Sequence, residues 1–151
     1  MTRKRTRRQV ITPMPPRGLR PKFTRPVLTD IAMAHIQTLD QIAKGGASEA
    51  TLWHMVEAAF TWQRVAQVLG RGEEEMLAQL DLATDVVERY RDHGVIVFKG
   101  PEYQKAKLGV QVMDELAELV DEATAKAAAA WSNAKLDDLV DRARAQMRRV
   151  A

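Results

Sequence analysis

Cysteine is absent from the chain. Its absence excludes disulfides, zinc sites built on thiolates and thiol nucleophiles, and it favours a reducing, cytoplasmic setting. No apolar run approaches the roughly 20 residues that span a bilayer, so no membrane partner is expected. The charged start is not followed by the apolar segment of a secretory signal, and its prolines oppose an amphipathic transit helix.

Acidic residues are missing from one part of the sequence. Residues 1–29 contain nine Lys/Arg, five prolines and no Asp or Glu. Residues 30–141 carry a net charge of −10, and residues 142–151 return to +4. The overall charge of +3 therefore averages a basic arm, an acidic body and a basic end. This segregation predicts a polyanionic partner for the two basic segments.

After the arm, apolar residues recur at helical spacing, and glycines interrupt the pattern. Gly45 and Gly46 end one helical segment, Ser48 is placed to cap the next, and Gly94 is placed at a C-terminal cap. The sequence predicts an all-α fold, a bundle-like domain of four to five helices over residues 30–151, preceded by an extended or disordered arm over residues 1–29. The predicted helices are about 30–44, 48–69, 72–93, 101–131 and 133–149.

Two details of this prediction leave alternatives open. The apolar stripe changes phase at Ser132-Asn133, which favours a new helix there; a continuous helix of about 48 residues would instead form a rod of roughly 70 Å. The only strand-like run is "VIVF" at 95–98. Because a lone strand of this length cannot satisfy its own backbone, it is either a buried extended link or a strand paired with another segment.

Catalytic and metal signals are weak, and we expect no enzyme, no cofactor and no bound metal. His54 and Glu57 share a helix face, but an exposed pair is the simpler reading. No phosphate-binding glycine loop or nucleophile elbow is present. Several carboxylates at helical spacing could in principle bind a cation, but such a pattern is more typical of a solvent-exposed helix face. This acidic ladder consists of Asp114, Glu118, Asp121 and Glu122.

Aromatic residues are few, and two of them, Trp53 and Trp62, lie nine residues apart on one apolar helix, where core packing is favoured over base stacking. Residues 39–56 could also form a helix-turn-helix. Its base-contacting positions would be Ser48 to Thr51, which bring one acid and no base, so a plain helical hairpin is favoured.

The arm has the chemistry of a phosphate-binding segment. Guanidinium groups bind phosphate bidentately, and prolines reduce the entropy lost when an extended chain is ordered. DNA and RNA remain open as partners, as do an acidic protein surface and a purely solubilising role. The C-terminal arginines would contribute if the C-terminus folds near the arm. The predicted nucleic-acid-binding residues are Arg3, Lys4, Arg5, Arg7, Arg8, Arg17, Arg20, Lys22, Arg25, Arg142, Arg144, Arg148 and Arg149.

The chain contains the segments "RPKFTRPV", "WHMVEAAF", "GRGEEE" and "GPE". With these segments it resembles small helical proteins of proteobacterial phages and plasmids that begin with a basic Pro/Arg arm. The resemblance implies a mobile-element setting, where nucleic-acid regulators, virion components and defence inhibitors are common. It implies no activity and no functional residue.

Together these features predict a non-enzymatic, nucleic-acid-associated protein with a regulatory role, whose helical body supplies a homo-oligomer contact or a docking face. The alternative is a protein-interaction module, either a phage structural or assembly component or an inhibitor of a host complex.

Overall fold

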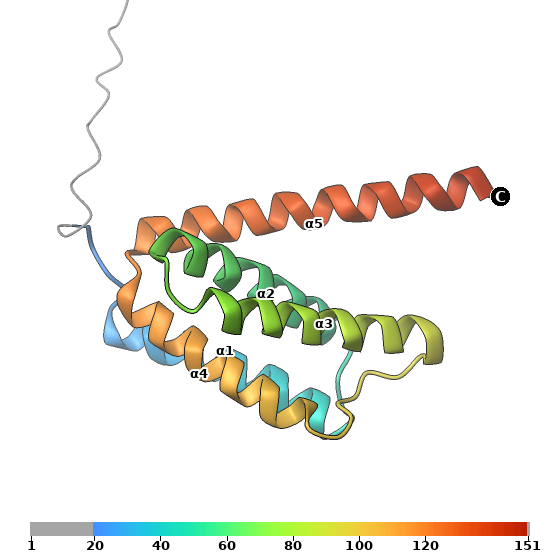
Figure 1. Ribbon diagram of the computed structural model, residues 1–151, viewed down its shortest axis with the longest axis horizontal. Coiled ribbons are helices and arrows are strands. Elements are labelled where there is room, and N and C mark those ends of the chain that lie inside the picture. Colours follow the sequence, from blue (N-terminus) through green and yellow to red (C-terminus); the bar gives the residue numbers. More distant parts are fainter. Residues whose placement is uncertain (1–19, 151) are drawn as a thin grey trace, which may run out of the picture.

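The computed structural model describes residues 20–150, and these residues form five α-helices, which confirms the predicted all-α bundle (Figure 1). Within this range no strand is present, and the one β-bridge joins Lys22 to Asp121. The helices are α1 (Arg25–Ala43), α2 (Glu49–Leu69), α3 (Glu73–His93), α4 (Glu102–Leu119) and α5 (Glu122–Val150).

Helices α1 to α4 form a bundle, and α5 is added to its outside. In the bundle α1 packs against α2 and α4, while α3 packs against the other sides of the same two helices. Helix α5 lies along α2 and extends past the bundle toward the C-terminus (Figure 1). No helix in residues 20–150 is both long enough and apolar enough to cross a membrane.

The core is made of aliphatic and methionine side chains at helical spacing, as the apolar stripes predict. One close approach depends on a glycine: a Cβ on Gly109 of α4 would overlap the side chain of the buried Gln79 on α3. The largest fully buried hydrophobic side chains are Ile42, Leu52, Val65, Met76, Val86, Met113 and Val120.

The predicted caps of α2 and α3 are confirmed. The Ser48 hydroxyl accepts a hydrogen bond from the Thr51 amide at 3.3 Å, and the Thr51 hydroxyl accepts one from the Ser48 amide. This reciprocal arrangement satisfies two amides that the first turn leaves free. Gly94 ends α3 with φ of +71°, a left-handed conformation that glycine adopts without steric cost.

The predicted start of the first helix is wrong by five residues. Helix α1 begins at Arg25, with Thr24 at the N-cap position and Pro26 in the first turn. Proline is tolerated there because the amide it lacks would have no helical partner. Thr29, the predicted cap, lies inside the helix and donates its hydroxyl to the Arg25 carbonyl at 3.1 Å. The predicted arm boundary at residue 29 therefore moves to residue 24, and residues 1–19 lie outside the described part.

The predicted division between helices over 101–131 and 133–149 is also wrong, although the outer ends agree with α4 and α5. The chain breaks instead at Val120, whose backbone is extended, and Asp121 then caps α5. The predicted break at Ser132 is absent: this residue is fully buried within α5 and donates its hydroxyl to the Glu57 carbonyl of α2 at 3.3 Å. The continuous rod over residues 101–149 is excluded as well.

The run at 95–98 is a link rather than a strand, but it is only half-buried, and Val95 is exposed. Ile96 and Phe98 pack against the core, and the Arg89 guanidinium donates to the Val97 carbonyl at 2.6 Å. The same guanidinium binds both carboxylate oxygens of Glu102, at 2.9 and 3.1 Å. These bonds hold the link between α3 and α4 in place.

Candidate nucleic-acid interface

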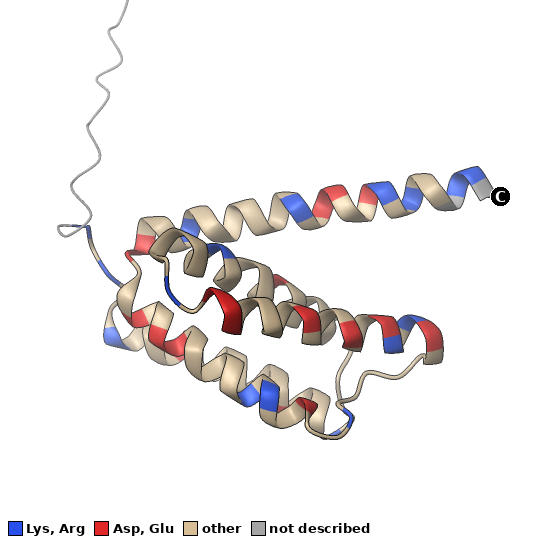
Figure 2. Ribbon diagram, in the orientation of Figure 1, with Lys and Arg blue, Asp and Glu red and all other residues tan. Residues whose placement is uncertain are grey.

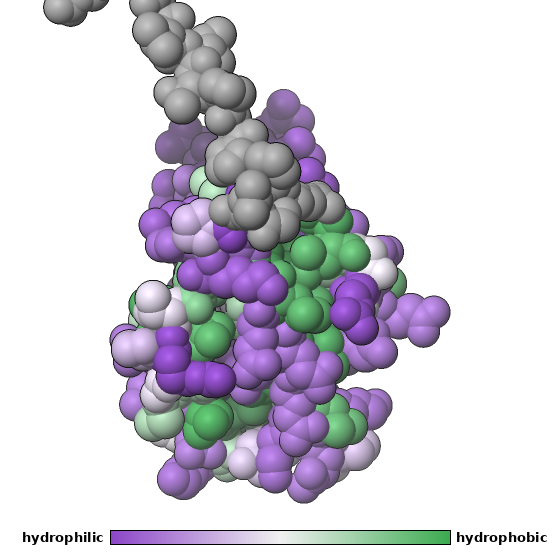
Figure 3. Space-filling model, turned by 90° about the vertical axis from the view of Figure 1, so that its left-hand side faces the viewer, coloured by the Kyte–Doolittle hydropathy of each residue, from purple (hydrophilic) through white to green (hydrophobic). Residues whose placement is uncertain are grey.

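The described part of the predicted interface begins where the chain enters the bundle. Arg20, Lys22 and Arg25 lie at the end where α1 and α5 start (Figure 2). Hydrophilic side chains cover most of this end, with several hydrophobic ones exposed between them (Figure 3). The other predicted cations of the arm lie outside the described residues, and they are Arg3, Lys4, Arg5, Arg7, Arg8 and Arg17.

The base of the arm is fixed to the bundle by backbone contacts. The Pro21 carbonyl accepts a hydrogen bond from the Glu122 amide at 2.9 Å, beside the bridge between Lys22 and Asp121. Phe23 packs against the core. The chain therefore enters α1 from a defined position next to the first turn of α5.

Carboxylates of the body already face two of these three cations. Burial by itself would raise the pKa of the Asp121 carboxyl. The carboxylate, however, accepts hydrogen bonds from the Thr124 hydroxyl at 2.6 Å and from the Thr124 amide at 2.8 Å. These bonds and the charge of Arg20 outweigh the effect of burial, so the pKa of Asp121 lies below its usual value. Arg25 lies 3.7 Å from Glu118, in an exposed pair worth about 0–1 kcal/mol. Arg20 thus stabilises the Asp121 carboxylate, whereas Arg25 and Lys22 are both exposed.

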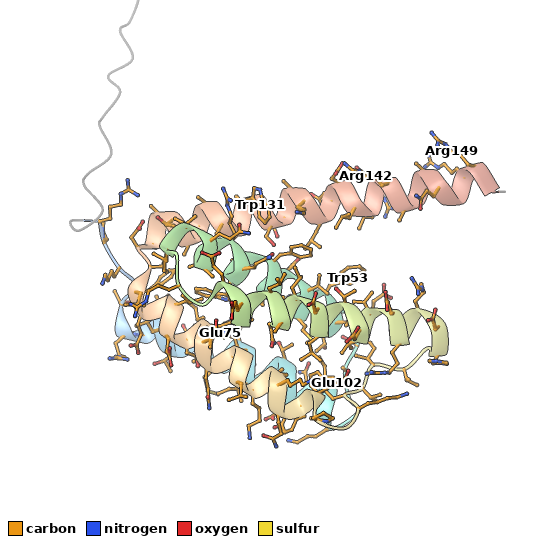
Figure 4. The ribbon with its side chains drawn as sticks, viewed as in Figure 1. Trp53, Glu75, Glu102, Trp131, Arg142 and Arg149 are labelled. Atoms are coloured by element: carbon orange, nitrogen blue, oxygen red, sulfur yellow. The ribbon has the colours of Figure 1, made fainter. Side chains whose placement is uncertain are left out.

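The C-terminal arginines do not join this group. Helix α5 starts beside Pro21 and runs away from it, so at 1.5 Å per residue Arg142 lies about 30 Å and Arg149 about 40 Å along the helix from Glu122 (Figure 4). In the described part of the chain, the C-terminus does not fold near the base of the arm, residues 20–24. Arg142 pairs with Asp138 at 2.8 Å. Arg144, Arg148 and Arg149 are exposed and form no ion pair with any residue of 20–150.

The bundle between these two basic groups is acidic. Helix α3 alone carries seven Asp/Glu against two Arg. Most of these carboxylates are exposed and follow the helix along the body (Figure 2). Phosphate would be repelled from this surface.

The alternative sites identified in the sequence do not assemble. His54 lies 3.7 Å from Glu57 with most of its side chain exposed. Asp121 is used as a helix cap and Glu122 pairs with Lys126 at 2.8 Å, so the acidic ladder does not converge. In the described part of the chain no three His, Asp or Glu side chains are grouped to hold a metal ion.

The helix-turn-helix alternative also loses two of its four contact positions, Ser48 and Thr51. Ser48 and Thr51 bind one another in the cap, and Thr51 is buried and donates its hydroxyl to Gln41 at 2.8 Å. These side chains are therefore not free to reach base edges.

The three tryptophans lie in different environments. Trp62 is buried, as predicted, whereas the prediction for Trp53 is wrong, because 39% of this residue is exposed. Trp131 is half-buried, with the Lys135 ammonium 4.8 Å and the Arg64 guanidinium 5.3 Å from the ring centre. The Lys135 ammonium and the Arg64 guanidinium thus both lie over this ring, where a stacked base would have to bind.

A buried polar group that the sequence did not reveal links three helices. The Trp62 indole donates to Nε2 of His35 at 3.2 Å, and Nδ1 of His35 lies 3.6 Å from the Asp114 carboxylate. The three residues are 27 or more positions apart, so no local pattern indicates them. His35 and Trp62 line a cavity of about 600 Å³ between α1, α2, α4 and α5.

The chemistry of this group is that of a structural network. Burial lowers the pKa of His35, and the neighbouring Asp114 charge only partly offsets the effect. Because Nε2 accepts from Trp62, the neutral ring carries its proton on Nδ1, which faces Asp114. No hydroxyl of residues 20–150 forms a hydrogen bond with His35.

Comparisons with known proteins add no family to this description: no protein-family model, no curated protein and no solved structure matches the chain.

Proposed function

We propose that this protein is a non-enzymatic, nucleic-acid-associated protein with a regulatory role, which binds the phosphate backbone through its N-terminal arm. The observation that carries the proposal is the segregation of charge. Nine Lys/Arg and no acid occupy residues 1–29, next to a body of net charge −10. The body would be repelled by phosphate, so contact would be confined to the basic segments.

The fold narrows which cations are expected to do the binding. Arg20 and Arg25 face Asp121 and Glu118, and the α5 arginines lie about 30–40 Å away along the helix. The main phosphate contacts are therefore assigned to the six cations that precede Arg20, with Lys22 as the exposed cation at the base of the arm. Such contacts give affinity without sequence choice, so selectivity would need a further element.

A full-length charge-neutralised variant tests the proposal. In this variant Arg3, Lys4, Arg5, Arg7 and Arg8 are changed to Gln, which leaves the Pro21–Glu122 joint intact. Binding of nuclease-treated protein to duplex DNA and to single-stranded RNA would be measured by fluorescence anisotropy over a salt series. If all five residues contact duplex phosphates, the slope of log K against log salt should become shallower by about 4–5.

The matched control changes Arg142, Arg144, Arg148 and Arg149 to Gln, which removes a similar charge from the far end of α5. Measured on a duplex of about 10 base pairs, so that only one arm can bind at a time, the control should lose much less affinity than the arm variant. Equal binding by the wild type and the arm variant would refute the proposal.

The second candidate, a protein-interaction module, is favoured by a different observation: an apolar groove between α2, α3 and α5. Purification with and without nuclease separates the two candidates. Co-purifying nucleic acid that depends on the arm supports the first. A defined protein partner that survives nuclease and the arm substitutions supports the second.

A further inference from the structure

The C-terminal part of α5 has no neighbour within its own bundle. All side chains described beyond Val140 are exposed, namely those of residues 141–146, 148 and 149. We call residues 141–150 the α5 tail. A helical segment of this length without tertiary contacts is marginal in water, so a stable tail needs a surface to pack against.

An apolar groove lies at the root of the tail. It has a volume of about 280 Å³ and is lined by α2, α3 and α5 with almost entirely apolar side chains. Trp53 and Phe60 contribute from α2, Leu80 and Val87 from α3, and Leu139 and Val140 from α5. Trp53 and Leu139 remain 39% and 43% exposed, so a large apolar surface is left open to water.

The apolar stripe of α5 continues from this groove into the tail with the spacing of a coiled coil. Leu136 and Val140 are four residues apart, Ala143 follows three later, and Met147 and Val150 repeat the steps of four and three. This alternation is a heptad a/d pattern. Leu136 is buried in the groove region, whereas Ala143 is exposed and lines the groove edge. The stripe therefore passes from a covered to an uncovered section of one helix face.

Charge indicates what covers it. Helix α3 lines the groove with uncharged side chains, but along its whole length it carries seven exposed Asp/Glu and two Arg, while residues 142–150 carry four Arg and no acid. A segment that is helical, apolar on one face and basic on the others fits this groove, and the α5 tail is such a segment. It cannot fold back into its own groove, because the groove lies alongside the same helix.

We propose that two copies of this chain form a dimer in which each α5 tail packs antiparallel to the other α5 and lies in the groove of the other bundle. Val140 of one copy then lies opposite Ala143 of the second copy. The same surface is used by both molecules, which closes the assembly at two. The basic tail of each copy then lies beside helix α3 of the other, which carries a net negative charge.

The charges that flank the stripe select the antiparallel orientation. In the heptad frame Asp137 and Arg144 both occupy e positions, while the g positions are held by Leu139 and Gln146. In an antiparallel pair e faces e, so Asp137 of one copy meets Arg144 of the other, twice. In a parallel pair e faces g, and these charges find no opposite partner.

Two matched alanine substitutions test the dimer. Ala143→Glu places a carboxylate in the contact, and Ala145→Glu places the same carboxylate two residues later, about 200° around the helix. Both alanines are exposed, so the monomer fold should tolerate either change, and circular dichroism would confirm this. Sedimentation equilibrium of nuclease-treated protein should show a dimer for the wild type and for Ala145→Glu. Dimerisation of Ala143→Glu should be at least about 100-fold weaker, because each dimer would bury two unpaired carboxylates.

A charge exchange tests the orientation. Asp137→Arg should weaken the dimer by placing like charges together, and adding Arg144→Asp in the same chain should restore it. A wild-type monomer at every concentration, or a dimer that Ala143→Glu leaves intact, would overturn the proposal. Failure of the exchange to restore binding would overturn the antiparallel arrangement. The inference does not depend on nucleic acid, since the arm variant with five Gln substitutions should still form the dimer.

Discussion

At the scale of single residues, His35 shows how distant neighbours decide the charge of a side chain. Its ring accepts a hydrogen bond from Trp62 and faces Asp114, and the surroundings are otherwise largely buried. Burial disfavours the charged imidazolium, which lowers the pKa of His35 below its ordinary value of 6.5.

This lowered pKa predicts a loss of stability in mild acid. Below pH 6.5 the unfolded chain binds a proton at His35 that the folded chain does not yet bind, so the free energy of unfolding falls as the pH decreases from 6.5 toward the folded-state pKa. His35→Gln should flatten this dependence between about pH 7 and pH 5. Thermal unfolding followed by circular dichroism over this range provides the measurement.

His54→Gln is the matched control for this experiment, because the His54 side chain is 71% exposed. It should leave the pH dependence of the wild type unchanged. A wild-type melting temperature that does not vary between these pH values would contradict the argument.

Residue-level features divide clearly into those that the sequence predicts and those that it does not. Ser48 and Gly94 could be predicted as caps because capping depends only on residues close in sequence. The Ser48 side chain bonds to the amide of Thr51, and Gly94, which has no side chain, adopts the left-handed conformation that ends α3. The His35 group was not predicted, since its members come from α1, α2 and α4. Trp53 was assigned to the core from the apolar spacing, and only the packing of α5 decides that it stays half open.

At the scale of elements, the junction between α4 and α5 is the feature that the sequence predicts least well. The break at Val120 contains neither glycine nor proline, and Asp121 resembled one more carboxylate in an acidic ladder. The false break at Ser132 arose for the opposite reason. A serine inside a helix competes for backbone groups locally, but here its hydroxyl bonds to Glu57, 75 residues earlier.

Removing the Asp121 cap should therefore destabilise the fold. Asp121→Ala leaves the Thr124 amide without its acceptor and should cost about 1–2 kcal/mol at pH 7. Because the pKa of this carboxyl is lowered in the folded state, its contribution is present above its ordinary value of 3.8 and is lost as the pH falls below it. Urea unfolding at pH 7 and near pH 3 should thus show a smaller cost in acid.

Asp141→Ala serves as the control, since Asp141 is exposed on the same helix. It should change the free energy of unfolding by less than about 0.5 kcal/mol. An equal cost for the two substitutions would show that Asp121 does not act as a cap.

At the scale of the whole molecule, the sequence predicts the charge segregation but not its geometry. The arm, body and tail are visible in the order of charged residues. Their separation could not be predicted, because it depends on the direction of α5, which begins at the Pro21 carbonyl and carries its arginines to the other end.

The proposed dimer and the proposed binding function together predict a dependence on the length of the nucleic acid. The contact between the two α5 helices lies about 20 residues from each Glu122, so the bases of the two arms would be roughly 60 Å apart. This distance corresponds to about 18 base pairs of duplex. Affinity should therefore increase more than proportionally when the duplex is extended from about 10 to about 30 base pairs, because the second arm then binds at a high effective concentration.

The Ala143→Glu variant provides the comparison, since a monomer has one arm. Its affinity should rise only in proportion to the number of available sites. The same length dependence in both proteins would show that the two arms act independently.

The attachment of Pro21 to the first turn of α5 has one more consequence. Helix α5 places the base of the arm and the proposed dimer contact on different residues, about 30 Å apart along the helix. A substitution in the α5 tail can therefore change self-association without altering the arm, and it should affect nucleic-acid binding only through the number of arms that one assembly carries.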